Sequence, residues 1–204
     1  NERRVIANTD AELIGRLGND LRGMRQDYAQ NEPIVRRIHS GWINAFRSLD
    51  NCTVTPEHRP SISHALAQYQ TGFGLAVQKS AFDEMKSVGA FSRIDNIELQ
   101  NEISTLYSML EIQVAAEKSG RINQLAAGRI MWKSIAFSFA GDEPGDEDYD
   151  DWGTAAFSPL SHCDDLELRG AVWELVDTHR DWLSVRSYYD ERMISILNQL
   201  EILE

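Results

Sequence analysis

The sequence has no apolar run approaching the roughly 18 residues that a membrane-spanning helix requires, and it shows no signal peptide. Basic residues are also scarce, because 20 lysines and arginines stand against 32 aspartates and glutamates, giving a net charge of -12. Such a charge repels phosphate backbones and removes the attraction that dominates nonspecific binding to nucleic acid. The basic clusters Arg3-Arg4 and Arg36-Arg37 are short, so we interpret them as solvated helix surface. We therefore expect no nucleic-acid partner.

Familiar catalytic motifs are missing as well. The sequence has no Gly-x-Ser-x-Gly elbow, no phosphate-binding loop and no His-Glu-x-x-His pair. The segment Gly72-Phe73-Gly74 lacks the third glycine and the preceding strand of a nucleotide-binding loop, so it predicts a flexible turn. These absences exclude the easily recognised hydrolases and nucleotide enzymes. They favour a non-enzymatic role without a cofactor and leave any catalytic residue unassigned.

What the chain does contain is the composition of one folded domain. Of its 204 residues, 42% are hydrophobic, and they include five Trp, seven Phe and six Tyr. Apolar residues recur at three- and four-residue spacing, and no alternating strand pattern lies between them. We predict a single all-α domain over residues 1–204, an antiparallel helical bundle with an acidic loop near 141–163. The long helices at the two termini are expected to pair.

Prolines, glycines and capping residues divide the apolar segments into separate expected helices. In chain order these are a helix over 13–28, one from Pro33 to Asp50, one after Ser61, one from Asp95 or Asn96 to Gly120, one after Gly120, and a last long helix capped by Asp164 or Asp165. Pro56 and Pro60 are expected to confine the second connection to a loop.

The segment from Lys79 to Gly89 reads Lys-Ser-Ala-Phe-Asp-Glu-Met-Lys-Ser-Val-Gly and is well formed as a short helix. Ser80 is the expected N-cap and Gly89 the expected stop. A narrow apolar face is expected from residues at three-residue spacing, Phe82, Met85 and Val88. The remaining residues that could face solvent or a partner form a candidate interaction surface, Lys79, Lys86 and Ser87. An ordinary core helix would show the same spacing, so that alternative stays open.

This segment resembles a phrase found in a group of uncharacterised bacterial proteins, which have one N-terminal membrane-spanning helix followed by an all-helical extramembrane domain. The following segment, Asn96 to Ile103 with Leu106-Tyr107, is similar to the next helix of those proteins. The resemblance implies a membrane anchor ahead of residue 1. It also implies a location at the bacterial inner membrane, with the domain in the periplasm. The cytoplasmic face stays open, because the basic pair Arg3-Arg4 beside a span favours that side.

The two cysteines, Cys52 and Cys163, lie far apart in the sequence and could form one disulfide in an oxidising compartment. Two free thiols are the alternative. A zinc site that adds His58 and His162 is a third interpretation, although it lacks the close Cys-x-x-Cys spacing typical of zinc ligands. Asn51-Cys52-Thr53 also fits a glycosylation sequon, which matters only in a glycosylating secretory pathway.

Carboxylates are dense between residues 142 and 153, and Asp146, Asp148 and Asp150 are weak candidates for a hard cation such as calcium. The spacing is not that of an EF-hand loop, so a solvated acidic loop without metal is the better interpretation. Glu98 and Glu102 share one side of the central helix, yet no Glu-x-x-His completes a di-metal motif. We interpret them as solvated surface.

Histidines give no clear catalytic signal. His179 lies between apolar residues and is expected to be a hydrogen-bonded core or boundary histidine. His39 and His64 have no recognisable partner in the sequence.

Three classes of function remain. We favour a membrane-tethered sensory or protein-interaction domain of unknown ligand, which could self-associate as a homo-oligomer. A structural scaffold of the cell envelope is the first alternative. The second is a metal-dependent hydrolase that uses carboxylates of the acidic loop with His162.

Overall fold

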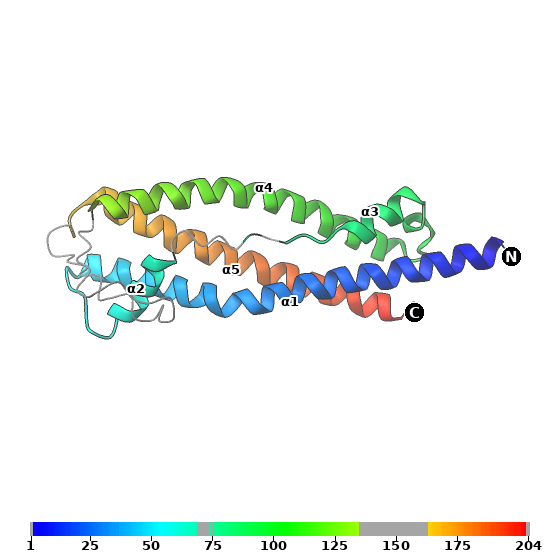
Figure 1. Cartoon of the computed structure of the whole chain (residues 1–204), viewed down its shortest axis with the longest axis horizontal. Coiled ribbons are helices and arrows are strands. Elements are labelled where there is room, and N and C mark those ends of the chain that lie inside the picture. The colour runs from blue at the N-terminus through cyan, green and yellow to red at the C-terminus, as the bar shows by residue number, and fades with distance from the viewer. Residues whose placement is uncertain (1, 69–73, 75, 135–162, 203–204) are drawn as a thin grey trace, which may run out of the picture. The chain divides into compact units, whose positions relative to one another are not determined.

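A computed structural model describes residues 2–68, 74, 76–134 and 163–202, and these residues are helical except for short connections. The described elements follow one another along the chain as α1 (Glu2–Asp50), α2 (Arg59–Ala67), α3 (Ser80–Ser87), the 3-10 helix η1 (Phe91–Arg93), α4 (Ile97–Ser134) and α5 (Leu166–Glu201) (Figure 1). The predicted all-α class is confirmed. The acidic loop near 141–163 lies outside the described residues, except for its last residue.

Pro33 does not begin a new helix, which corrects the sequence analysis. Residues 2–50 form one helix, and Pro33 lies inside it. A proline in a helix interior removes one backbone hydrogen bond and costs about 3 kcal/mol. Because proline has no N–H, the carbonyl of Ala29 lacks its usual hydrogen-bond donor in the helix. Ala29 and Pro33 are both exposed, so water can solvate that carbonyl. Two residues earlier, the Asn31 side chain donates a hydrogen bond to the Asp27 carbonyl at 2.9 Å.

Gly120 does not end the central helix either. The two helices expected on either side of it are one helix, α4. A glycine terminates a helix readily when its backbone takes a positive φ, as Gly89 does after α3 with φ of 73°. A glycine that keeps the helical conformation costs only about 1 kcal/mol relative to alanine, which a helix of 38 residues tolerates.

The chain divides into two compact units, and α1, α4 and α5 each contribute a part to both. Unit 1 comprises residues 1–31, 74–116 and 185–204. Its core is built from leucines and methionines of the three long helices together with residues of α3. The largest contributors include Leu17, Leu21, Met24, Phe82, Met85, Leu106, Tyr107, Met193 and Leu197.

Polar contacts fix the helix directions in unit 1. Arg22 on α1 lies 3.9 Å from Glu201 on α5, and Arg25 lies 2.6 Å from Asp190. Higher numbers on α1 therefore pair with lower numbers on α5, so these two helices are antiparallel and the expected pairing of the terminal helices is confirmed.

The start of α4 also runs against α5 in unit 1. Glu102 accepts a hydrogen bond from Gln199 at 2.7 Å, and the Met109 carbonyl accepts one from Tyr189 at 3.1 Å. Within this unit, α1 and α4 are therefore parallel to each other and antiparallel to α5.

Unit 2 comprises residues 32–73 and 117–184. Its core joins α1, α2, α4 and α5 through Ile38, Trp42, Leu49, Ile62, Leu66, Met131, Leu168, Val172 and Leu175. The helix α2 packs directly on α1 at Gly41, where a Cβ atom would lie 2.2 Å from the Ser61 carbonyl oxygen and 2.6 Å from the Ala65 Cβ. Only glycine allows this close approach. The expected start of α2 after Ser61 is slightly late, because Arg59 and Pro60 already form its first turn.

The predicted caps of the two later long helices are confirmed, and each choice left open is settled. The Asn96 side chain accepts hydrogen bonds from the backbone of Glu98 and Leu99 at 3.0 and 3.1 Å. The Asp165 side chain accepts from Glu167 and Leu168 at 2.9 and 3.1 Å. Both are standard N-caps that satisfy otherwise unpaired donors of a first helical turn.

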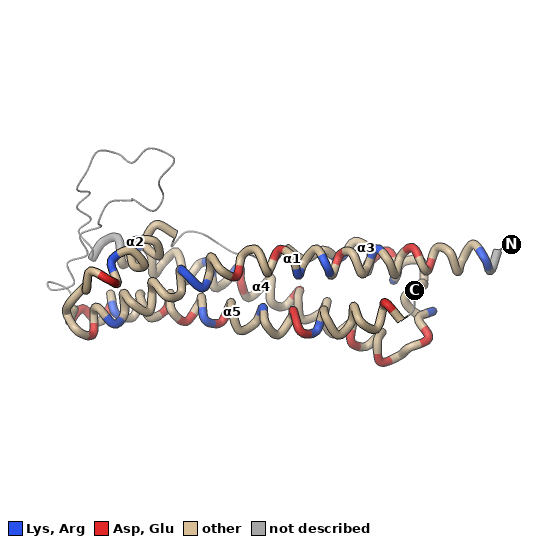
Figure 2. Tube along the Cα trace, turned by 90° about the horizontal axis from the view of Figure 1, so that it is seen from below, with Lys and Arg blue, Asp and Glu red and all other residues tan. Residues whose placement is uncertain are grey.

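Along the helices that the structure describes, acidic and basic residues are interspersed, and neither sign gathers into one large region of these helices (Figure 2). Of the helices in the described part of the chain, none has an apolar stretch long enough to cross a bilayer.

Candidate interaction site around α3

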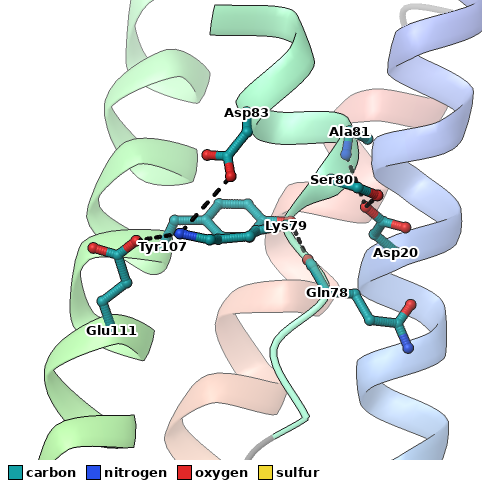
Figure 3. A network of polar contacts seen from close by, with 8 residues as sticks. All are labelled: Asp20, Gln78, Lys79, Ser80, Ala81, Asp83, Tyr107 and Glu111. Carbon is teal, nitrogen blue, oxygen red and sulfur yellow. Dashed lines mark hydrogen bonds and ion pairs between the residues drawn. The ribbon is translucent and has the colours of Figure 1, made fainter.

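The start of α3 is held by a carboxylate from another helix. The backbone N–H of Ala81 donates to Asp20 on α1 at 3.2 Å, and the Ser80 hydroxyl lies 3.5 Å from the same oxygen (Figure 3). The N-cap position is Lys79, which makes no capping hydrogen bond through its side chain. The expectation that Ser80 caps this helix is therefore wrong. A carboxylate at a helix N-terminus also meets the positive end of the helix dipole, so Asp20 acts as the cap.

An aromatic stack fastens the inner side of α3. The ring of Phe82 lies on the ring of Tyr107 from α4, with centroids 4.3 Å apart and planes 5° from parallel. The Tyr107 hydroxyl donates to the Gln78 carbonyl at 3.2 Å, so one buried residue holds both the helix and the segment before it. Burial, and to a lesser degree the charges of Asp20 and Asp83, raises the pKa of Tyr107. Tyr107 therefore stays a neutral donor.

The segment before α3 passes close to α1. A Cβ atom on Gly23 would lie 2.8 Å from the Gln78 side-chain oxygen. Glycine at this position leaves room for Gln78, whose carbonyl in turn receives the Tyr107 hydroxyl. The entry to α3 is thus defined by contacts with both α1 and α4.

Lys79 is exposed, as expected, but it is engaged in ion pairs. Its Nζ lies 3.0 Å from Glu111 on α4 and 3.8 Å from Asp83 one turn along α3 (Figure 3). The hydrogen bond with Glu111, followed by the charge of Asp83, raises the pKa of Lys79. Of the three residues of the candidate surface, Lys79 therefore belongs to the attachment of α3.

Lys86 and Ser87 are exposed near the end of the helix. The Lys86 ammonium lies 5.1 Å from the centre of the Phe82 ring, and the Ser87 hydroxyl donates to the Glu84 carbonyl at 2.8 Å. Glu84 itself forms a 2.7 Å ion pair with Arg16 on α1. These contacts set the orientation of both side chains without covering them.

Val88 differs from the expected apolar face. Phe82 and Met85 are buried, as expected, whereas Val88 is 50% exposed. The helix ends at Ser87, and Gly89 then turns the backbone with a positive φ, so position 88 no longer continues the helical face. We define the α3 surface as Lys86, Ser87 and Val88. It offers a cation, a hydroxyl and an apolar side chain next to one another in the sequence.

The two cysteines are joined in a disulfide in unit 2. The Cα atoms of Cys52 and Cys163 are 5.4 Å apart, and 111 positions separate them in the sequence. The bridge connects the turn after α1 to the residues just before α5. An ion pair between Asp50 and Arg169 joins the same two helix ends.

The bonded cysteines do not offer thiolates to zinc in this structure, which argues against the zinc interpretation. His162, the fourth proposed ligand, lies outside the described residues, as do the cation candidates Asp146, Asp148 and Asp150. Within the part of the chain that is described, no group of three or more His, Cys, Asp or Glu could hold a metal ion.

The remaining candidates have structural surroundings. Glu102 accepts the hydrogen bond from Gln199, while Glu98 is exposed beside the Asn96 cap. His179 is 4% exposed, and its Nδ1 lies 2.7 Å from the Leu175 carbonyl, which confirms the expected hydrogen-bonded core histidine.

Sequence reasoning missed Asp20, Tyr107 and Glu111 as supports of α3. No local sequence pattern reveals these residues, because each contacts a residue far away in the sequence. An amphipathic helix contains many residues of these types, and only the packing selects the three that contact α3.

No protein family model, curated protein or solved structure matches the chain.

Proposed function

We propose that this chain is a protein-interaction domain that presents the α3 surface to a protein partner outside the cytoplasm, tethered to a membrane by a segment ahead of α1. The observation that carries the proposal is the construction of α3. Asp20 holds its start and Tyr107 holds its inner side. Lys86, Ser87 and Val88 stay exposed. A fixed surface loses little conformational entropy when a partner binds, which favours affinity.

The disulfide supports the location. Disulfides persist in oxidising compartments such as the periplasm and are rare in the reducing cytosol. Cys52 and Cys163 are well placed to be bonded, because the turn after α1 and the start of α5 meet at this point. The proposed periplasmic location agrees with the resemblance of the Lys79 to Gly89 segment to membrane-anchored bacterial proteins.

The first turns of α1 support the tether. Residues 4–9 are all exposed and include Val5 and Ile6. Short helical segments without packing are marginal in water, so such turns gain stability when the helix continues into another segment or lies near a membrane surface. We propose that the tether joins α1 at this end.

The partner is expected to match the chemistry of the α3 surface. We expect the partner to pair a carboxylate with Lys86 and to bury Val88 against an apolar side chain. A photoreactive amino acid at Ser87 should cross-link such a partner in cells. The matched control is the same amino acid at Ser108, which is exposed on α4 of the same unit.

Binding of the purified, cross-linked partner then decides the proposal. Lys86→Glu places like charges in contact and should weaken binding at least about tenfold. Lys118→Glu makes the same charge change at an exposed position of unit 2 and should leave binding unchanged. Equal affinities of the wild type and the Lys86→Glu variant would show that the α3 surface is not the binding site.

A further inference from the structure

Two histidines lie at matching levels of α1 and α5 in unit 2, because Asp50 and Arg169 form an ion pair, His39 is eleven residues before Asp50, and His179 is ten residues after Arg169. His179 on α5 is buried, and because a carbonyl oxygen only accepts hydrogen bonds, its contact with Leu175 places a proton on Nδ1. His39 on α1 is half-buried, and its Nε2 is shielded from solvent with no hydrogen-bond partner among the described residues. These surroundings favour the neutral form of both imidazole rings.

The charges around this pair oppose protonation. Burial is the main cause that lowers the pKa of His39, followed by the positive charges of Arg180 and Arg36. Burial also lowers the pKa of His179, partly offset by the hydrogen bond to Leu175, and the charge of His39 lowers it further. A proton on either histidine therefore disfavours a proton on the other.

The carboxylates nearest these arginines are already paired with them. Glu32 lies 2.6 Å from Arg36, while Arg180 forms ion pairs with Asp177 and Asp181. Two other described helices, α2 and α4, also pack in unit 2. Their partly buried titratable groups are Glu117 and Arg121 on α4 and His64 on α2. Glu117 is the only carboxylate in the unit 2 part of α4, and it would favour protonation if it faced the pair.

We propose that the His39–His179 pair is an acid-sensitive switch, in which proton uptake loosens the packing of α1 against α5 within unit 2. Protonation would add positive charge to two ring systems that are shielded from solvent, within the influence of the positive charges of Arg180 and Arg36. The helices then relieve the repulsion by separating, which solvates the rings.

The pH range follows from the pKa values of the two states. The unfolded pKa of histidine is 6.5, and the folded pKa of each ring is lower. The stabilisation is therefore complete above about pH 6.5 and is lost as the pH falls from there through the folded pKa. Over this range, each histidine raises the unfolding constant by up to about tenfold per pH unit.

The test is urea unfolding between about pH 7.5 and pH 5, a range that histidine titration dominates. All five tryptophans of the sequence fall within the residue ranges of unit 2, so their fluorescence follows this unit. The wild type should lose stability steeply below about pH 6.5. The double variant His39→Gln/His179→Gln should show a clearly smaller loss, because glutamine keeps polar groups at both positions and takes up no proton.

A second measurement uses the wild type alone, in case the variants fold poorly. Proton NMR follows the ring signals of His39 and His179 in the folded protein as the pH is lowered. Both should titrate below the ordinary histidine range, with line broadening as unit 2 opens. Titration of both rings at or above about pH 6.5 would overturn the proposal, and so would equal pH dependence of the wild type and the double variant.

This switch does not depend on the proposed interaction. The histidines belong to unit 2 and the α3 surface belongs to unit 1, so each test uses residues that the other leaves intact. If the unfolding measurements contradict the histidine switch, the binding result with the Lys86→Glu variant is unaffected. If the binding result contradicts the proposed interaction, the unfolding measurements are unaffected.

Discussion

Removing the disulfide should destabilise unit 2 substantially, and the structure sets the size of the effect. The bond between Cys52 and Cys163 closes a chain loop across 111 positions. In the chain-entropy account, closing such a loop lowers the entropy of the unfolded chain and stabilises the folded state by about 5 kcal/mol at 25 °C. Removing a native disulfide typically costs about 2 to 5 kcal/mol of the free energy of unfolding. The double variant Cys52→Ala/Cys163→Ala should therefore lose free energy of unfolding within this range.

Urea unfolding followed by tryptophan fluorescence measures this loss in the appropriate unit, because all five tryptophans fall within the ranges of unit 2. With a urea dependence of about 2 kcal/mol per molar, in the middle of the typical range, the midpoint should fall by about 1 to 2.5 M. Reduced wild type should behave like the double variant, and a reducing agent should not affect the double variant itself. Unchanged midpoints after reduction and in the variant would refute the reasoning, because the crosslink would then not restrict the unfolded chain.

Two further substitutions test the packing. Asp20→Ala removes the cap of α3 and should cost about 1 kcal/mol, with faster hydrogen exchange at the Ala81 amide as the local signature; unchanged exchange there would contradict the cap. Gly41→Ala forces a Cβ to within 2.2 Å of the Ser61 carbonyl and should lower the free energy of unfolding by about 1 to 3 kcal/mol. Gly120→Ala is its matched control, because a Cβ there meets nothing within 4 Å and should stabilise α4 by about 0.5 to 1 kcal/mol; equal effects of the two glycine substitutions would contradict the packing account.

Local capping signals predicted two helix starts to within one residue. Asn96 and Asp165 both stand directly before an amphipathic segment, and each satisfies backbone donors of its own first turn. The capping hydrogen bonds join residues that lie within four positions of each other, so the local sequence contains both partners. The apolar spacing of Leu17, Leu21 and Met24 likewise predicts the buried side of α1.

Helix breaks could not be predicted from the same local rules. Pro33 and Gly120 disfavour a helix by about 3 and about 1 kcal/mol, which suffices to end an isolated segment. In the folded chain, however, α1 and α4 gain burial of apolar residues on both sides of these positions, and this burial outweighs the local cost. Propensity sets the cost of a continuous helix, while tertiary packing decides whether the helix continues.

The supports of the α3 surface depend on contacts that the sequence does not reveal. Asp20 precedes its partner Ala81 by 61 positions, and Lys79 is 32 positions from Glu111. Val88 was assigned to the buried side by its spacing, yet the helix ends one residue earlier. The exposed character of Lys79, Lys86 and Ser87 was nevertheless expected correctly. Spacing thus located most of the surface, whereas its attachment required the fold.

The state of Cys52 and Cys163 in intact cells tests the central claim, that this domain works outside the cytoplasm, most directly. Cells are quenched with acid, free thiols are blocked, and the protein is then reduced and labelled with a maleimide polymer that adds mass to each released thiol. The account predicts two added labels in the full population, because both cysteines are bonded to each other. Complete blocking before reduction, with no added label, would contradict the proposed location.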